Sequence, residues 1–289
     1  MEILSAVPWY GAKFQIAEAL ASKYKRSGIT TFIDGCGGSG KMVINAPAYP
    51  EMVYNDLDTA LCCMFRCIKE KNLFLPFLRE LNNRKYELST FEKANNCLIM
   101  FDIEQEMVKN SKLGKITFDL NNEAVILEIG ISKYIVICQS YNATQSSFRP
   151  ATVENLETYH NRFLTLVDVH YRMNHLGIEI SNKDMFQMLE DSINEKDSST
   201  LYALDVPYIA GDDQERKAIG AYHKMDWDIR LHERLMDIVY KEFTVPILIC
   251  GYKSLLYKER LLYDGSPWKE IGIAEVAKSA SSKKVQKQG

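Results

Sequence analysis

Apolar runs alternate with helix-compatible stretches in residues 29–71. Residues 29–34 (ITTFID) are β-branched and aromatic, and they lead into a glycine cluster and a helix-compatible stretch at 39–46. Residues 52–54 form a second short apolar run, and residues 57–71 carry one apolar stripe at helical spacing. That stripe consists of Leu57, Leu61, Met64, Phe65 and Ile68. Two successive strand–helix units predict an α/β protein with a doubly wound sheet.

The pattern changes after residue 71. Residues 73–81 and 89–94 have helical periodicity. Three short runs in polar surroundings predict strands, at 115–120, 124–129 and 134–138. We therefore expect an inserted, smaller and mostly helical domain at 72–165.

The alternation of helix and strand returns after this insertion. The predicted elements are a helix at 153–176, a strand at 178–180, a helix at 183–193, a strand at 201–204, a helix at 228–243 and a strand at 245–250. The main domain is then discontinuous, with residues 1–71 and 166–275 on either side of the insertion. Residues 276–289 are small, polar and basic, which predicts a disordered tail.

Composition narrows the class of protein. The chain has 289 residues, of which 46% are hydrophobic, so it can bury a real core. Its formal net charge of −3 lacks the basic excess of a typical nucleic-acid-binding protein, so any DNA-facing surface has to be local. Neither a signal-peptide pattern nor a long apolar run is seen. These features are typical of a reduced, soluble, cytoplasmic protein without a membrane span.

The 7 cysteines form no CxxC pair. Cys62, Cys63 and Cys67 share one predicted helix, but no histidine partner lies near them in the sequence. We therefore interpret them as buried core thiols rather than as ligands, and we expect no metal.

A glycine-rich loop follows the first predicted strand. Residues 35–40 fit the pattern G-x-G-x-x-G, and Asp56 at the end of the next strand could accept both hydroxyls of a ribose. A nucleoside-containing cofactor is therefore expected. Adding Lys41 gives G-x-x-x-x-G-K, but Met42 stands where a P-loop needs a hydroxyl for magnesium. The loop alone leaves a dinucleotide site and a simple tight turn open.

Two further motifs are typical of neither a dehydrogenase nor an ATPase. Residues 8–13 read PWYGAK, and residues 201–208 read LYALDVPY. Together with the glycine loop, the Asn55-Asp56 strand end and residues 140–142 (SYN), they resemble, in order, the motifs of DNA adenine methyltransferases of the Dam type. Further similarities lie later in the chain, at residues 180–186 and 232–235. The resemblance covers most of the chain.

This resemblance implies both a fold and an activity. The fold is a Rossmann-like, doubly wound methyltransferase sheet with an inserted target-recognition domain. The activity is transfer of a methyl group from S-adenosylmethionine to the exocyclic amino group of adenine in a specific duplex DNA sequence, after base flipping. The implied partner is double-stranded DNA, joined by a separate restriction endonuclease if the enzyme serves a restriction–modification system. Oligomeric state stays open.

The resemblance also implies roles for single residues. Trp9, Tyr10 and Lys13 would bind the methionine end of the cofactor. The turn beneath the cofactor would be shaped by Asp34, Gly37, Gly38, Ser39 and Gly40. Asp56 would hold the ribose hydroxyls and Asp184 the adenine ring of the cofactor. In the catalytic motif, Asp205 and the Val206 carbonyl would accept hydrogen bonds from the target amino group, Pro207 would fix the backbone, and Tyr208 would stack on the extruded base.

One residue departs from the family motif, which has proline where this chain has Val206. Valine restores a backbone donor and loosens φ. Because Val206 precedes Pro207, it is still confined to extended conformations, so we expect its carbonyl to point as the family's does. The alternative is a cofactor-binding, DNA-binding protein with impaired catalysis. A nicotinamide-dependent oxidoreductase is a third hypothesis, which rests on the glycine loop alone.

The predicted insertion carries balanced charge, so a DNA-binding surface there requires segregation of its acids from its bases. Candidate phosphate contacts form two groups: Arg79, Arg84 and Lys85, and Lys109, Lys112 and Lys115. The resemblance adds Tyr141 and Asn142 as candidate DNA-binding residues. A solvated charged face explains either basic group equally well.

Overall fold

The structure is a computed structural model, and it describes residues 3–9, 28–110, 116–207, 227–240, 244–251 and 255–270. Its centre is one sheet of 5 parallel strands in the order β3-β2-β1-β4-β5. The strands are β1 (Thr31–Asp34), β2 (Glu51–Asn55), β3 (Glu179–Ser181), β4 (Thr200–Leu204) and β5 (Ile247–Ile249). The predicted α/β class and parallel sheet are confirmed, and the arrangement is consistent with a Rossmann-like fold.

Both faces of the sheet are buried, as alternation along its central strands shows. Phe32 and Ile33 are neighbours on β1, yet each packs into a different apolar cluster. On β4, Leu201 and Ala203 join the first cluster, whereas the intervening Tyr202 joins the second. Because successive strand side chains point to opposite faces, a central strand covered on both sides reads as a continuous apolar run.

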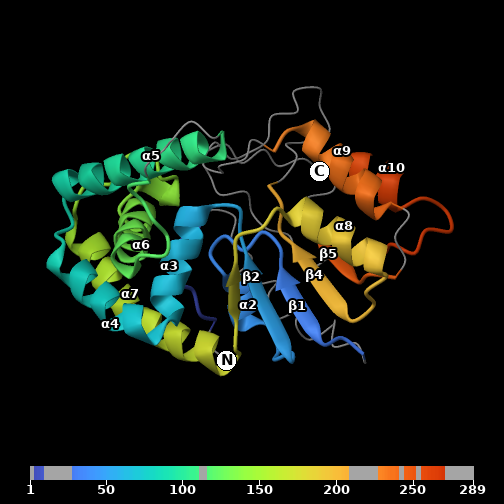
Figure 1. Cartoon of the computed structure of the whole chain (residues 1–289), viewed down its shortest axis with the longest axis horizontal. Helices are drawn as coiled ribbons and strands as arrows, with labels where there is room; N and C mark the ends of the chain where they lie inside the picture. The colour runs from blue at the N-terminus through green and yellow to red at the C-terminus, as the bar shows by residue number, and fades with distance from the viewer. Residues whose placement is uncertain are drawn as a thin grey trace, which may run out of the picture.

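Helices cover both faces of the sheet (Figure 1). On one side lie α8 (Met185–Glu195), α9 (Ile229–Val239) and α10 (Leu255–Leu261). The other side carries a larger helical layer. It contains α3 (Thr59–Lys69), α4 (Lys71–Asn83), α5 (Leu88–Lys109), α6 (Glu123–Cys138) and α7 (Val153–His175), while the short α2 (Lys41–Asn45) follows the glycine loop.

The predicted strands at 124–129 and 134–138 are wrong, because both segments lie within α6. Their β-branched residues favoured strands, but a short apolar run does not distinguish a strand from a fully buried helix. Asn122 caps this helix by accepting a hydrogen bond from the Ala124 N–H at 2.9 Å. The strand predicted at 115–120 is described from residue 116 onward, and that part is irregular.

Residues 129–137 of α6 are all buried, and the helix packs closely on α3. A Cβ at Gly130 would lie 2.7 Å from Cys67 Sγ and 3.1 Å from the Cys63 carbonyl oxygen. Cys67 Sγ also lies 3.6 Å from the Ile126 carbonyl oxygen. All of these residues are buried, as is Cys62, so the interpretation of the helix cysteines as core thiols is confirmed.

The helical layer shares one core with the sheet. A single apolar cluster extends from Tyr54 on β2 through Phe65 on α3 and Tyr134 on α6 to Phe101 on α5. The Tyr54 and Phe65 rings are 4.4 Å apart at their centroids. Burial of this aromatic area is the main force that fixes the helices on the sheet.

Among the described residues, no helix is both long enough and apolar enough to cross a membrane. Helix α5 extends well beyond the predicted segment at 89–94. The predicted tail at 276–289 lies outside the described residues.

Candidate functional site

The carboxyl ends of β1, β2 and β4 border one pocket, at the point where the strand order reverses. Open parallel sheets bind ligands at this place. The pocket brings together eight of the residues that the sequence singled out: Trp9, Gly37, Gly38, Ser39, Asp56, Asp184, Asp205 and Pro207. Two others, Asp34 and Gly40, are buried beside it.

The glycine loop needs glycine because its neighbours approach so closely. A Cβ at Gly37 would lie 2.3 Å from the Tyr54 ring. Gly38 has a φ of +49°, and a Cβ there would lie 3.0 Å from the indole nitrogen of Trp9. The tight turn therefore brings Trp9 against the loop and exposes backbone to the pocket.

The glycine N–H groups of this loop are already used within the protein. The N–H of Gly35 donates to the Ala203 carbonyl at 2.9 Å, and that of Gly37 to the Asn55 carbonyl at 2.8 Å. The N–H of Gly40 donates to the Gly37 carbonyl at 2.8 Å. That of Gly38 donates to Asp56 Oδ2, also at 2.8 Å. A loop that cradles phosphate instead directs such N–H groups at the ligand.

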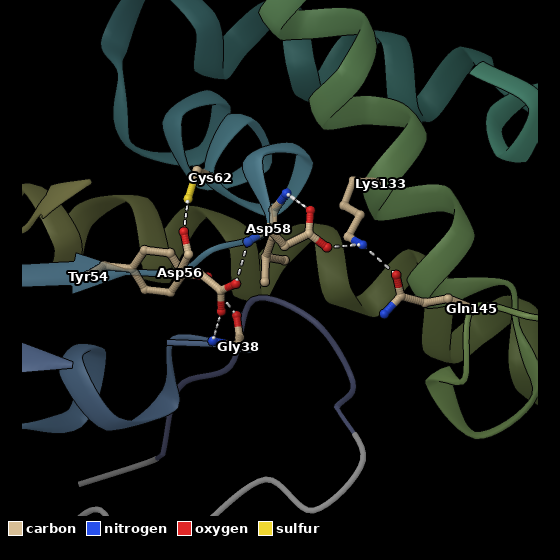
Figure 2. A network of polar contacts seen from close by, with 8 residues as sticks. Gly38, Tyr54, Asp56, Asp58, Cys62, Lys133 and Gln145 are labelled. Atoms are coloured by element: carbon tan, nitrogen blue, oxygen red, sulfur yellow. Dashed lines mark hydrogen bonds and ion pairs between the residues drawn. The ribbon is translucent and has the colours of Figure 1, made fainter. Parts of the chain in front are cut away.

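Asp56 is fixed in the pocket wall by backbone donors. Its second carboxylate oxygen accepts a hydrogen bond from the Asp58 N–H at 2.8 Å (Figure 2). Burial, and then the charge of Asp58, raises the pKa of Asp56 to about 6. Each carboxylate oxygen has two lone pairs, so Asp56 can still accept hydrogen bonds from a ligand's hydroxyls.

Carboxyl groups outnumber amines around the pocket. Asp56, Asp58, Asp184 and Asp205 line it, against Lys41 and Lys183. Behind the wall, Asp34 is fully buried; burial, and then the nearby Asp205, raises its pKa well above the ordinary value. Such a wall favours a cationic or neutral ligand group over an anionic one.

The segment after β4 has a pocket side and a core side. Asp205 and Pro207 line the pocket, whereas Val206 is 1% exposed and packs in the second apolar cluster. In that cluster, Trp227 stacks on Phe186 with centroids 5.6 Å apart. Val206, which stands where the motif of the resembled family has proline, therefore points into the core rather than at the pocket.

His232 lies under this segment and packs edge-on against Trp227. Its Nδ1 is 2.9 Å from the Tyr257 hydroxyl oxygen. Burial lowers the pKa of His232 to about 4, so the ring is neutral at neutral pH. Asp184, by contrast, both lines the pocket and caps α8, where its carboxylate accepts the Phe186 N–H at 2.8 Å.

The candidate DNA-binding residues do not gather in the pocket. Lys85, Lys109, Tyr141 and Asn142 are exposed, and the Arg79 side chain is 71% exposed. Arg84 instead forms a two-pronged ion pair with Glu128 on α6. Tyr10, Lys13, Tyr208, Lys112 and Lys115 lie outside the described residues.

Sequence reasoning missed Asp58 and Lys133. Asp58 lines the pocket, and Lys133 on α6 reaches it with an Nζ–Oδ2 distance of 2.6 Å. A signal was present, because Lys133 is a single charge within the apolar run at 129–137. Buried charges are nearly always paired, so such a lysine indicates a buried partner.

Comparison with known proteins adds no assignment to this geometry. No protein-family model and no curated protein matches the chain. The pocket and the motifs are therefore the basis for a proposed function.

Proposed function

We propose that this protein binds S-adenosylmethionine in the pocket and transfers its methyl group to the exocyclic amino group of adenine in duplex DNA. The observation that carries the proposal is the glycine loop's internal hydrogen bonding within an acid-rich wall. The pocket has features of a nucleoside site, but its glycine N–H groups are not directed at a phosphate. S-adenosylmethionine fits this combination, because it joins an adenosine to a sulfonium cation and carries no phosphate.

The same features argue against the nicotinamide hypothesis. A dinucleotide needs a pyrophosphate at the glycine loop and the following helix N-terminus. Here the Gly38 N–H is taken by the Asp56 carboxylate, 2.8 Å away. An anionic pyrophosphate at this position would compete with that carboxylate for the same donor. It would also lie beside Asp184 and Asp205.

Two described residues support the binding part of this proposal. The Asp56 carboxylate lines the pocket and could accept ribose hydroxyls, and Trp9 lines it beside Gly38. When bound, S-adenosylmethionine supplies an electrophilic sulfonium methyl group. The aromatic amine of adenine is a poor nucleophile because its lone pair is delocalised into the ring. Acceptors at Asp205 and at the Val206 carbonyl would draw its protons out of plane and restore lone-pair character.

The target base has to leave the duplex to reach this pocket. Extrusion costs on the order of a few kcal/mol, and aromatic stacking in the site can return about 1–3 kcal/mol of it. The resemblance assigns that stacking to Tyr208, which lies outside the described residues. Among the described residues, the resemblance offers exposed Tyr141 and Asn142 for contact with the DNA, in addition to the basic candidates on the helical layer.

The second candidate function is a cofactor-binding, DNA-binding protein with impaired catalysis, and Val206 is the observation that favours it. The two functions differ in what Val206→Pro does. An active enzyme keeps its activity within a few-fold, because the side chain faces the core. An impaired protein gains activity that the native chain lacks.

The decisive experiment incubates the native protein with S-adenosylmethionine and unmethylated DNA, then measures methylated nucleosides by mass spectrometry. We expect N6-methyladenine as the product. A folded protein that binds the cofactor but leaves every adenine unmodified would contradict the proposed methyltransferase activity. It would favour the second candidate, a DNA-binding protein with impaired catalysis. Matched reactions with Asp205→Ala exclude a contaminating activity.

A further inference from the structure

A buried ion pair joins the pocket to the helical layer. Lys133 Nζ lies 2.6 Å from Asp58 Oδ2, and the two side chains are only 6% and 12% exposed. Figure 2 shows Lys133 extending from α6 toward Asp58 on one side and Gln145 on the other. Gln145 Oε1 accepts a second hydrogen bond from the ammonium at 2.5 Å. Burying a lysine in this way is costly unless its partners are held in place.

Asp58 connects Lys133 to the pocket through further hydrogen bonds. Its other carboxylate oxygen caps α3 by accepting the Leu61 N–H at 3.1 Å. Its own N–H donates to Asp56, whose other oxygen holds the Gly38 N–H. A continuous chain of hydrogen bonds therefore runs from Lys133 through Asp58 to Asp56 and the glycine loop (Figure 2).

Gln145 connects Lys133 to a loop whose backbone conformation is unusual. Asn142, Ala143 and Gln145 have φ values of 49°, 57° and 61°, a region that residues other than glycine rarely adopt. Such conformations persist only where the surroundings hold them. Here the Gln145 N–H donates to Ser140 Oγ at 3.0 Å, and its side chain accepts from Lys133. The loop so held exposes Tyr141 and Asn142.

We propose that Lys133 is a positioning residue that holds the ribose-binding Asp56–Asp58 turn of the cofactor site and ties it to the loop that carries Tyr141 and Asn142. This inference rests on the proposed function, since it assigns Lys133 to the same site. Lys133 itself touches neither cofactor nor base. It acts through Asp58 on one side and through Gln145 on the other.

The charges around Asp56 give this role a distinctive pH signature. Asp58 raises the pKa of Asp56, and Lys133 lowers it to a smaller extent. The Asp56 charge also acts on Asp34 on β1, Tyr54 on β2, Cys36 in the glycine loop and Cys62 on α3. Because the ionised carboxylate accepts the ribose hydroxyls, affinity should rise with pH through the pKa of Asp56. Removing the Lys133 charge alone moves this rise in affinity to higher pH. Removing the charges of both Lys133 and Asp58 moves it to lower pH.

The experiment measures S-adenosylmethionine binding by calorimetry between pH 5 and pH 8, where those limits bracket the pKa of about 6. For Lys133→Met we expect about a tenfold loss of affinity at pH 7, because the Asp58 charge is left buried and unpaired. We also expect the affinity midpoint to move upward. The double variant Lys133→Met with Asp58→Asn has no unpaired buried charge, so it should fold even if the single variant does not, and its midpoint should move downward.

Glu128→Gln is the matched control. Glu128 lies on α6 like Lys133, but its half-exposed ion pair with Arg84 does not reach the pocket. Breaking this pair should therefore leave the affinity and its pH midpoint native. If native protein binds and neither Lys133 variant changes the midpoint, the positioning proposal is overturned. If native protein binds no S-adenosylmethionine at any pH, the proposed function fails instead.

The connection between Lys133 and the loop is tested by a second measurement, which does not involve the cofactor. Amide hydrogen exchange in residues 140–148 should be at least about threefold faster in the double variant than in Glu128→Gln, because the left-handed loop loses its buried anchor. Equal exchange in the two variants contradicts the tie to the loop.

Discussion

The two faces of the sheet support the two sides of the pocket in different ways. On the α3 and α6 face, one aromatic-rich cluster runs without a break from the strands to α5, and it backs the wall that holds Asp56. On the α8 and α9 face, a smaller cluster backs the segment at 205–207 and has the buried His232 among it. Under the proposed function, the first face backs the cofactor side of the pocket and holds it by packing and by the buried Lys133–Asp58 pair, whereas the second face backs the base side with a core that includes the buried His232.

The largest effect we expect comes from the base side, with Asp205→Ala. Losing this acceptor should lower the methyl-transfer rate about 10²–10³-fold, comparable to removing one preorganised polar group from other active sites. Methylated-base formation under single-turnover conditions measures it. Asp191→Ala, at an exposed carboxylate on α8, is the control and should keep native activity. If both variants behave alike, Asp205 has no part in the chemistry.

On the cofactor side, we expect disruption of the α3–α6 packing to lower the free energy of unfolding. Gly130→Leu forces a side chain into the α3–α6 contact, where even a Cβ would lie 2.7 Å from Cys67 Sγ. We expect the free energy of unfolding to fall by about 3 kcal/mol. Urea unfolding measures this loss. Lys93→Leu on the exposed side of α5 should change it by less than about 0.5 kcal/mol. A well-tolerated Gly130→Leu would mean that the two helices pack less closely than described.

The base side should also be the more sensitive to acid, because of His232. Its pKa of about 4 in the fold lies below the ordinary 6.5, so the neutral ring is favoured by folding. The stabilisation is present above pH 6.5 and is lost as the pH falls toward 4, by up to about 3 kcal/mol. Urea unfolding of the native protein and of His232→Gln should show a stability difference that narrows over this range. A constant difference would contradict the buried neutral ring.

The smallest effect is expected for Glu128→Gln, which breaks one of two ion pairs that α6 forms with neighbouring elements. Glu128→Gln breaks a pair whose side chains are 28% and 46% exposed, so stability should change by no more than about 1 kcal/mol. Lys133→Met breaks the buried pair with Asp58 and should cost several times more. Thermal unfolding of the two variants compares them directly. Equal losses would show that burial of the Lys133–Asp58 pair has little consequence.

Much of the sheet could be predicted from the sequence, and α6 could not. Residues 29–34 and 201–204 identified β1 and β4 because central parallel strands are continuously apolar. The run at 124–138 is mostly apolar as well, but it is a helix whose residues 129–137 are all buried, and no local pattern separates that case from a strand. Its environment is set by Gly130 and the cysteines of α3, which are distant in the sequence.

The site follows the same division. The glycine loop and Asp56 could be found because each follows a predicted strand, and parallel strands bring their carboxyl ends to one edge, whereas Asp205 was found through the resemblance of residues 201–208 to a family motif. Lys133 could not be placed, since its partner depends on how α6 packs on α3. The internal use of the glycine N–H groups was also invisible, because backbone hydrogen bonds leave no trace in residue type.

Separate binding titrations with two adenosine-containing ligands decide between the proposed cofactor and a dinucleotide. Calorimetric titration of the native protein at neutral pH with S-adenosylmethionine, and separately with NAD, compares a phosphate-free adenosine ligand with a pyrophosphate ligand at the same glycine loop. We predict saturable binding of S-adenosylmethionine, lost in Asp56→Ala, and no measurable binding of NAD. Binding of NAD without binding of S-adenosylmethionine would contradict the proposed function.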